Sequence, residues 1–229
     1  MENQIKYPII HPALVQGTPE WHKIRLGKFT GSEFCRLVTK PKAKDALLSE
    51  GAKTYCLEVV SERLTGKPAK EEFSNYAMEH GKQWEPIARQ TYEALYGTKV
   101  DQIGFIDFRP GVGYSPDGLI GTNGSIEIKC PSSNVPHLDF LRMTNLKEES
   151  AKYHWQVIGG LLCSGREWID FVSYSPFYPA ELKFKKYRIY AEEVQEEIAF
   201  LDEKLQIAEA ECQKIITELY EPSTGLLTI

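Results

Sequence analysis

The stretch from Lys99 to Lys129 constrains the fold most, because helix-forming residues give way there to β-branched and aromatic residues. Gly and Pro interrupt the stretch at short intervals, which is typical of strands joined by turns. Strands in the middle of a chain need other elements to cover their apolar faces. We expect strands at about 99–108, 112–115, 117–121 and 125–129.

Helical patterns lie on both sides of this stretch. Thr30 and Glu33 have the spacing of a capping box, and they predict a helix that ends at about Val38. These alternating patterns predict an α/β (α+β) fold with a central mixed β-sheet flanked by helices. Further helices are expected at about 48–65, 74–96, 135–143 and 148–163, and further strands at about 167–174 and 181–189.

The length of 229 residues predicts one domain, 1–229, whose two ends differ from its middle. Residues 1–20 hold three prolines and a glycine and are expected to form an irregular lead-in. Residues 191–220 repeat apolar residues at alternating spacings of four and three, which predicts an amphipathic helix. Its length favours packing on its own domain over a coiled-coil contact.

Charge and composition exclude several classes of protein. Residues 191–229 contain ten acidic residues and two lysines, a net charge of −8, so the total of −5 leaves +3 for the remainder. This asymmetry is compatible with a local nucleic-acid groove and a separate acidic face. No apolar run reaches the length of a membrane span, no signal-peptide pattern opens the chain, and the five cysteines form no C-x-x-C pair. We expect a soluble cytoplasmic protein without zinc or an iron–sulfur cluster.

The residues that suggest chemistry lie at the end of the predicted strands. Ser115-Pro116-Asp117-Gly118 precedes a turn-rich insert, and Ile126-Glu127-Ile128-Lys129 follows it. Residues two apart on a strand share a face, so Glu127 and Lys129 point one way and the two isoleucines point the other. One face of this strand is therefore expected to be ionic and the other buried.

The turn between these segments decides whether Asp117 joins the ionic face. A two-residue Asn-Gly turn would pair Ile120 with Glu127 and would turn Asp117 away. A three-residue loop over 122–124 would pair Asp117 with Lys129 and Leu119 with Glu127, and would bring the ionic groups together. We expect the three-residue loop or an equivalent bulge.

Such a group of charges is suited to phosphodiester hydrolysis. Two carboxylates held together repel unless a cation lies between them, and hard oxygen ligands suit Mg²⁺ or Mn²⁺. Lys129 would position or deprotonate a water, or stabilise charge in the transition state. The E-x-K pattern alone is common in ordinary hairpins, and the preceding P-D-G strengthens the interpretation without deciding it.

Four blocks of sequence, taken together, are more specific than E-x-K. The pattern resembles the PD-(D/E)xK nuclease core, which has a restriction-endonuclease-like fold, and the blocks resemble the phage lambda exonuclease family, also called YqaJ-type viral recombinases. The chain departs from the family in its lead-in and its acidic C-terminal helix. The four blocks are residues 21–27 with 31–33, residues 80–85, residues 115–118 with 127–131, and residues 153–157.

The resemblance implies roles for individual residues. It implies that Glu85, Asp117 and Glu127 bind metal with the backbone carbonyl of Ile128, and that two Mg²⁺ ions occupy the site, with Mn²⁺ as a substitute. Without the resemblance, Glu85 would be interpreted as a surface residue paired with Arg89. The remaining implied residues are Lys129 and Gln156 in catalysis, Arg25, Ser32 and Ser115 at the 5′-phosphate of DNA, and His80 and Asp107 in support.

The same resemblance implies a function. It implies a Mg²⁺-dependent exonuclease that degrades one strand of linear duplex DNA from 5′-phosphorylated ends and leaves 3′ single-stranded tails for recombination. A trimeric ring around DNA, a single-strand annealing protein as partner, and a phage or prophage gene in a bacterial host are also implied. Two alternatives stay open, an endonuclease on the same core and a catalytically silent module that binds DNA ends.

Overall fold

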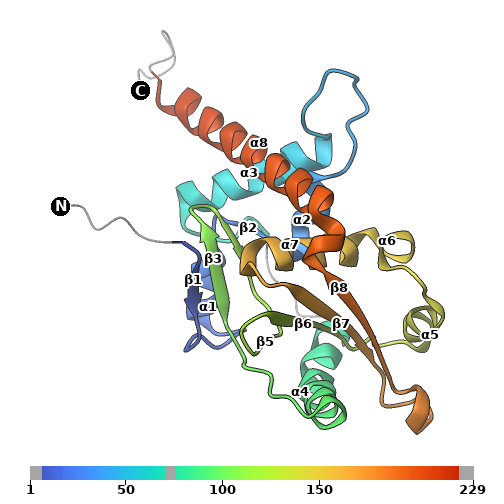
Figure 1. Cartoon of the computed structure of the whole chain (residues 1–229). Helices are drawn as coiled ribbons and strands as arrows, with labels where there is room; N and C mark the ends of the chain where they lie inside the picture. The colour runs from blue at the N-terminus through green and yellow to red at the C-terminus, as the bar shows by residue number, and fades with distance from the viewer. Residues whose placement is uncertain (1–6, 71–75, 222–229) are drawn as a thin grey trace.

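The computed structural model describes residues 7–70 and 76–221, and it has a mixed α/β fold. Its strands form two four-stranded sheets, not the single central sheet that we expected, and helices flank both (Figure 1). Pro116 lies between the strands β4 and β5, where the chain leaves one sheet for the other. Proline has no backbone N–H for a sheet ladder, which favours a break at this point.

The first sheet, sheet A, recruits the N-terminal segment. Its order is β1-β3-β4-β2, with β2 parallel to β4 and the other pairs antiparallel. The prediction of an irregular lead-in over residues 1–20 was wrong for β1 and the start of α1, and its residues 1–6 lie outside the described part of the chain. Pro19 begins α1 after the Thr18 cap, whose hydroxyl accepts from Trp21 N at 3.3 Å. The elements are β1 (Ile9–His11), α1 (Pro19–Arg25), β2 (Phe29–Thr30), β3 (Phe105–Arg109) and β4 (Val112–Tyr114).

The second sheet, sheet B, has the order β5-β6-β7-β8. Strands β6 and β7 are parallel and the other two pairs are antiparallel. Parallel neighbouring strands need a long crossover connection, and the chain makes it between β6 and β7 through three helices. The strands are β5 (Gly118–Ile120), β6 (Gly124–Lys129), β7 (Trp168–Tyr174) and β8 (Phe184–Tyr190).

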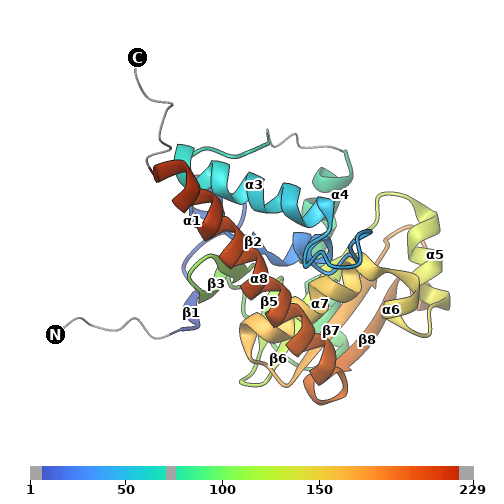
Figure 2. The same cartoon turned by 90° about the horizontal axis from the view of Figure 1, so that it is seen from above.

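Two helices cover opposite faces of sheet B (Figure 2). On α4 (Tyr76–Tyr96), Ala88 and Tyr92 pack with Ile126 and Ile128 of β6. On α7 (Ala151–Ser164), Val157 and Leu161 pack with Phe171 of β7. The face of β6 that carries Glu127 and Lys129 therefore lies on the α7 side, opposite the buried isoleucines.

The remaining helices differ locally from the predictions. Thr30 makes no side-chain cap, so the predicted capping box was wrong: its backbone N–H donates to Tyr55 Oη at 3.0 Å, and the residue ends β2. The helix expected at about 148–163 breaks at Ser150. These elements are η1 (Gly31–Glu33), α2 (Phe34–Leu37), α3 (Glu50–Thr65), α5 (Asn134–Arg142), α6 (Leu146–Glu149), η2 (Ala180–Leu182), η3 (Ala191–Val194) and α8 (Gln195–Tyr220).

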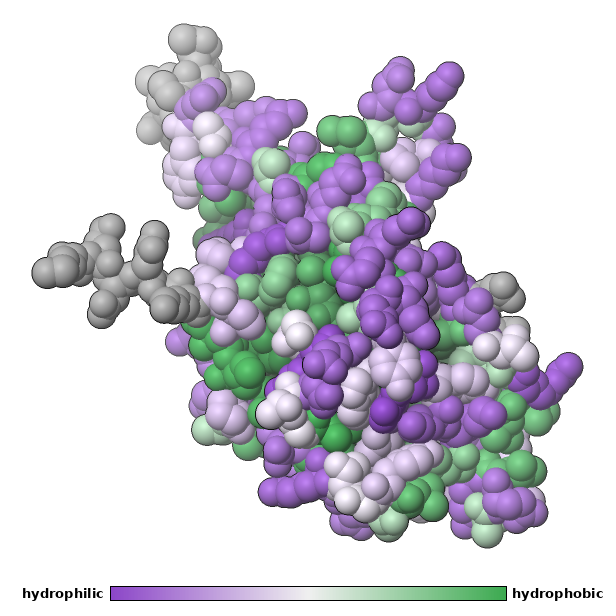
Figure 3. Space-filling model, in the orientation of Figure 1, coloured by the Kyte–Doolittle hydropathy of each residue, from purple (hydrophilic) through white to green (hydrophobic). Residues whose placement is uncertain are grey.

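The long C-terminal helix α8 packs on its own chain. Leu201, Leu205, Ala208 and Cys212 are buried in a core shared with α3 and α7. Hydrophilic side chains cover much of α8 and the loop between α2 and α3 (Figure 3). None of the helices in the described part of the chain combines the length and apolar character that a membrane crossing requires.

Candidate active site

The β5–β6 hairpin has a three-residue loop, but its register differs from the prediction. Leu119 pairs with Ser125, and not with Glu127, so the loop consists of residues 121–123. Gly121 takes the left-handed conformation, at φ +54°. Gly124 lies in the strand instead, where an added Cβ would come within 2.2 Å of the Trp168 ring. The Trp168 indole on the neighbouring strand thus requires glycine at 124. Because Gly124 belongs to the strand, the loop lies one residue nearer the N-terminus than predicted.

The observed register still places Asp117 with Glu127. The predicted and observed registers differ by two residues, so the same side chains share a face in both. Asp117 directly precedes Gly118, the partner of Ile126. Asp117 therefore lies level with Glu127 on the same face. Its Oδ2 accepts from Ile128 N at 2.6 Å, which holds the carboxylate against β6.

Glu127 is the most enclosed carboxylate of the site, with 1% of its surface exposed. Lys129 Nζ and Gln156 Nε2 each donate to its Oε1 at 2.6 Å. Tyr114 Oη donates to its Oε2 at 2.6 Å. Hydrogen bonds to a charged group are about twice as strong as neutral ones, so these donors stabilise the buried carboxylate in one orientation.

Tyr114 is a site residue that the sequence reasoning missed. Its ring is fully buried, and burial together with the charges of Glu127 and Asp117 raises its pKa, so its hydroxyl stays protonated as a donor. Space for the ring comes from two glycines: a Cβ on Gly31 would lie 2.5 Å from Cδ2, and one on Gly160 would lie 3.0 Å from Oη. The only signal in the sequence is that Tyr114 directly precedes the S-P-D-G block.

The electrostatics of the site reflect an excess of negative charge. Burial raises the pKa of Asp117 well above its ordinary value, and the charges of Glu127 and Glu85 raise it further. Burial lowers the pKa of Lys129, but Glu127 and Asp117 outweigh that effect and raise it above its ordinary value. Lys129 is thus a cation here, which favours charge stabilisation over the removal of a proton from water.

Glu85 approaches the carboxylates from α4. Its carboxylate forms an ion pair with Arg89, one turn further along the helix. Burial raises the pKa of Glu85, and Glu127 and Lys129 act on it with opposite signs. Glu85 therefore interacts electrostatically with Asp117 and Glu127, and its role as a metal ligand stays a prediction.

A cavity of about 210 Å³ joins the carboxylates to the residues expected at the 5′-phosphate. Arg25 Nη1 donates to Ser115 Oγ at 2.9 Å, and the guanidinium lies 4.2 Å from the centre of a Trp21 ring. The residues expected at the 5′-phosphate thus share one continuous space with Asp117, Glu127, Lys129 and Gln156, whereas Glu85 and Ile128 do not line it. The residues that line it are Gln16, Trp21, Arg25, Gly31, Ser32, Tyr114, Ser115, Asp117, Glu127, Lys129 and Gln156.

Two expected supporting residues do not line this cavity. Asp107 lies in sheet A, where its carboxylate pairs with His11 Nε2 at 3.0 Å and with Lys28. His80 is buried on α4 among the aromatic rings of Tyr76, Trp84 and Phe177. His80 lies in one of the family blocks and Asp107 lies ahead of S-P-D-G, but both side chains pack outside the cavity.

The donor set of the site fits a hard divalent cation. Within residues 7–70 and 76–221, no three His, Cys, Asp or Glu side chains form a preassembled metal cluster. Both oxygens of Glu127 accept hydrogen bonds, from Lys129, Gln156 and Tyr114, and Glu85 accepts one from Arg89. The chemistry nevertheless agrees, because buried carboxylates that raise one another's pKa are stabilised by positive charge, and oxygen donors suit Mg²⁺.

Solved structures with similar folds are known. An alkaline exonuclease (LHK-Exo) from Laribacter hongkongensis is 33% identical, with a TM-score of 0.77 over 92% of this chain and 100% of that chain. LHK-Exo in complex with dAMP gives 34% identity with the same TM-score and coverage. A phage related exonuclease from Haemophilus somnus 129PT, at 17% identity and a TM-score of 0.68 over 84% and 96% of the two chains, shares the fold. The curated proteins contain no match.

The fold, the cavity and the similarity to LHK-Exo define the class of protein, which is an enzyme of the exonuclease type. The family model described as the YqaJ-like viral recombinase domain matches residues 20–167. That match covers more than half of the chain and includes the cavity residues from Trp21 to Gln156. The chain therefore belongs to the YqaJ-like viral recombinase family.

Proposed function

We propose that this protein is a Mg²⁺-dependent 5′-to-3′ exonuclease that degrades one strand of linear duplex DNA from 5′-phosphorylated ends. One observation carries the proposal: Arg25, Ser32 and Ser115 share a single cavity with Asp117, Glu127 and Lys129. A strand end whose phosphate binds on one side of this cavity would present its first phosphodiester bonds to the other side.

Phosphate recognition is assigned to Arg25, Ser32 and Ser115. A guanidinium offers several N–H donors in a fixed plane, which match the oxygens of a terminal phosphate. Ser115 and Trp21 already hold the Arg25 side chain in place, so little side-chain entropy is lost when phosphate binds. A hydroxyl end lacks this anchor and would bind less well.

Hydrolysis is assigned to the carboxylates and their partners. Glu85, Asp117 and Glu127, with the carbonyl of Ile128, would hold two Mg²⁺ ions or the substitute Mn²⁺. When bound, Mg²⁺ supplies polarisation of the phosphate and a more acidic water. Arg89 bonds Glu85 through Oε1 and leaves Oε2 for a metal ion, whereas both oxygens of Glu127 accept hydrogen bonds, part of which would have to be exchanged.

Two further residues complete the assignment. The Lys129 ammonium, 2.6 Å from Glu127, is placed to stabilise negative charge that develops on the phosphate. Gln156, which now donates to Glu127 at 2.6 Å, would orient the attacking water or the scissile phosphate. Both side chains line the cavity, so both can reach a substrate bound there.

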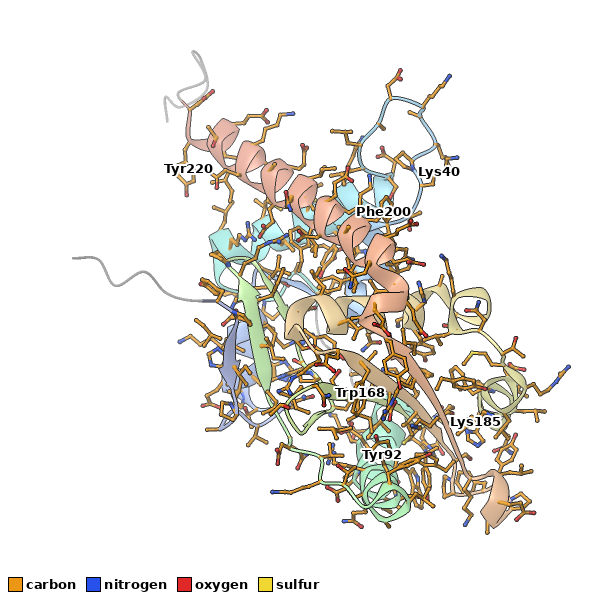
Figure 4. The ribbon with its side chains drawn as sticks, viewed as in Figure 1. Lys40, Tyr92, Trp168, Lys185, Phe200 and Tyr220 are labelled. Carbon is orange, nitrogen blue, oxygen red and sulfur yellow. The ribbon has the colours of Figure 1, made fainter. Side chains whose placement is uncertain are left out.

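The biological setting follows from the family. We propose that the exposed 3′ single-stranded tails serve recombination, with a single-strand annealing protein as partner, in the cytoplasm of a bacterium that carries the phage or prophage gene. A trimeric ring around the duplex would keep the enzyme on its substrate. Surface lysines such as Lys40 and Lys185, labelled in Figure 4, are candidates for phosphate contacts, which would make binding depend strongly on salt.

The test compares three DNA substrates with Mg²⁺: linear duplex labelled at its 5′ end, the same duplex labelled at its 3′ end, and closed circular duplex. Wild type is expected to release the 5′ label first as a mononucleotide and to leave the circle intact. Lys129→Ala should release the label about 100- to 1000-fold more slowly. Lys214→Ala, which removes a lysine from the exposed surface of α8, should match wild type.

Other outcomes would assign a different function. Cleavage of the circle would indicate an endonuclease on the same core. Early release of the 3′ label would reverse the proposed polarity. A wild-type protein that cleaves none of the substrates with Mg²⁺ or Mn²⁺ would instead be a silent module that binds DNA ends.

A further inference from the structure

We propose that an aromatic cluster beside the active site, formed by Tyr76, His80, Trp84 and Phe177, binds unpaired nucleobases of single-stranded DNA. His80 contacts the rings of Tyr76, Trp84 and Phe177 at centroid distances of 6.0, 6.2 and 6.0 Å. Tyr76 is 75% exposed and Phe177 is 65% exposed. Aromatic rings as exposed as these offer free faces on which bases stack.

The loop that carries Phe177 is held at both ends and in its middle. His137 hydrogen bonds to Ser173 Oγ and to Leu182 O, each at 2.8 Å. Tyr178 Oη donates to Asn134 O at 2.8 Å. Tyr178 is thus tied to α5 and Phe177 beside it is 65% exposed, so the exposure of Phe177 is a feature of an anchored loop.

The cluster and the active site lie at the same edge of sheet B. Strands β6 and β7 run parallel with Lys129 beside Ser173, so their carboxyl ends meet there. Lys129 ends β6, and the loop with Phe177 follows the end of β7. On α4, Trp84 directly precedes Glu85. A strand that leaves the carboxylates along this edge would reach the aromatic rings.

Charged groups at this edge favour a nucleic acid as the ligand of the cluster over the apolar surface of another protein. His80 is 5% exposed and its Nε2 is buried, so it packs beneath the exposed rings, and the charged groups of this edge are lysines. Lys183 and Lys185 lie at the same edge, since Ser175 N donates to Lys183 O at 2.9 Å and Ser173 pairs with Lys185. Lysines attract the phosphates of the strand while the rings accept its bases.

The proposal rests on the proposed function, because it takes the substrate of the active site to be DNA. The test measures binding and not cleavage: fluorescence anisotropy of labelled oligothymidine in EDTA, with an abasic strand of equal length as the second probe. Phe177→Ala and Tyr76→Ala are expected to weaken oligothymidine binding roughly five- to 150-fold each. Wild type should bind the abasic strand more weakly than either variant binds oligothymidine, because the abasic strand cannot stack on either ring.

Matched variants separate stacking from general effects. Tyr220→Ala removes a tyrosine that is also 75% exposed but lies at the far end of α8 (Figure 4), and it should bind as wild type does. Phe177→Trp keeps an aromatic face and should restore affinity. Equal losses on oligothymidine and on the abasic strand would overturn the proposal, because they would show that the rings do not read bases.

Failure of this proposal is distinguishable from failure of the proposed function. A wild type that cleaves linear duplex while Phe177→Ala and Tyr76→Ala bind oligothymidine normally would refute the aromatic cluster alone. A wild type that cleaves nothing, with binding still lost in the two variants, would refute the nuclease alone. Variants that keep DNA binding but change oligomeric state in sedimentation would assign the cluster to a protein contact and overturn the proposal.

Discussion

Replacing Tyr114 with phenylalanine removes one hydroxyl from the centre of the site. The ring would stay in the space left by Gly31 and Gly160, while Glu127 Oε2 would lose its donor at 2.6 Å. A hydrogen bond to a charged group contributes about 1.5–3 kcal/mol. For a protein of this length each kcal/mol corresponds to about 2–4 °C in Tm, so Tyr114→Phe should lower Tm by about 3–12 °C.

The metal response gives the sharper part of this prediction. Groups that orient a metal ligand affect metal affinity about 10- to 100-fold, so Tyr114→Phe should shift the Mg²⁺ concentration that stabilises the protein upward by that factor. Tyr92→Phe is the matched control, because Tyr92 Oη also donates at 2.6 Å to a buried carboxylate, that of Asp170. The control should lose stability and keep the wild-type Mg²⁺ response.

Calorimetric melting in EDTA and then across a MgCl₂ titration measures both effects. A Tyr114→Phe protein with the wild-type Tm and the wild-type Mg²⁺ midpoint would refute the reasoning. An equal shift of the Mg²⁺ midpoint in Tyr92→Phe would also refute it, because a loss of stability alone would then account for the change.

Three further predictions concern the buried charges. Because the pKa values of Asp117 and Glu85 are raised, the metal-free protein should lose stability as pH rises through those values. Asp117→Asn should therefore raise Tm at neutral pH in EDTA and flatten the dependence of Tm on pH. An unchanged dependence of Tm on pH would contradict this. Asp170 is fully buried and bound by Arg188, so Asp170→Ala should cost about 3–5 kcal/mol in urea unfolding, and a cost below about 1 kcal/mol would be inconsistent. Lys129→Ala should lower kcat on linear duplex by about 100- to 1000-fold with its melting transition retained, and near-normal turnover would exclude its assigned role.

Local periodicity predicted the strand that carries the site. The alternation from Ile126 to Lys129 indicated one ionic and one buried face, and the structure confirms both. It also places Asp117 with Glu127, which the hairpin parity predicted. These features depend on residues close together in sequence, so the pattern of the strand was sufficient.

Features that depend on distant residues were not predictable in this way. The hairpin register depends on Trp168, whose indole fills the space beside Gly124. The contact of Tyr114 with Glu127 depends on Gly31 and Gly160, which meet only after folding. The two-sheet architecture required the N-terminal segment to pair with β3, and its prolines and glycine gave no indication of a strand.

The most direct test of the account is the ratio of initial rates on 5′-phosphorylated and 5′-hydroxyl linear duplex, measured for wild type and Arg25→Ala. Arg25 shares one cavity with Asp117 and Glu127, so wild type should prefer the phosphorylated end and the variant should lose that preference. A wild type that degrades both ends at the same rate, or a variant that keeps the preference, would contradict the claim that this cavity reads the 5′-phosphate.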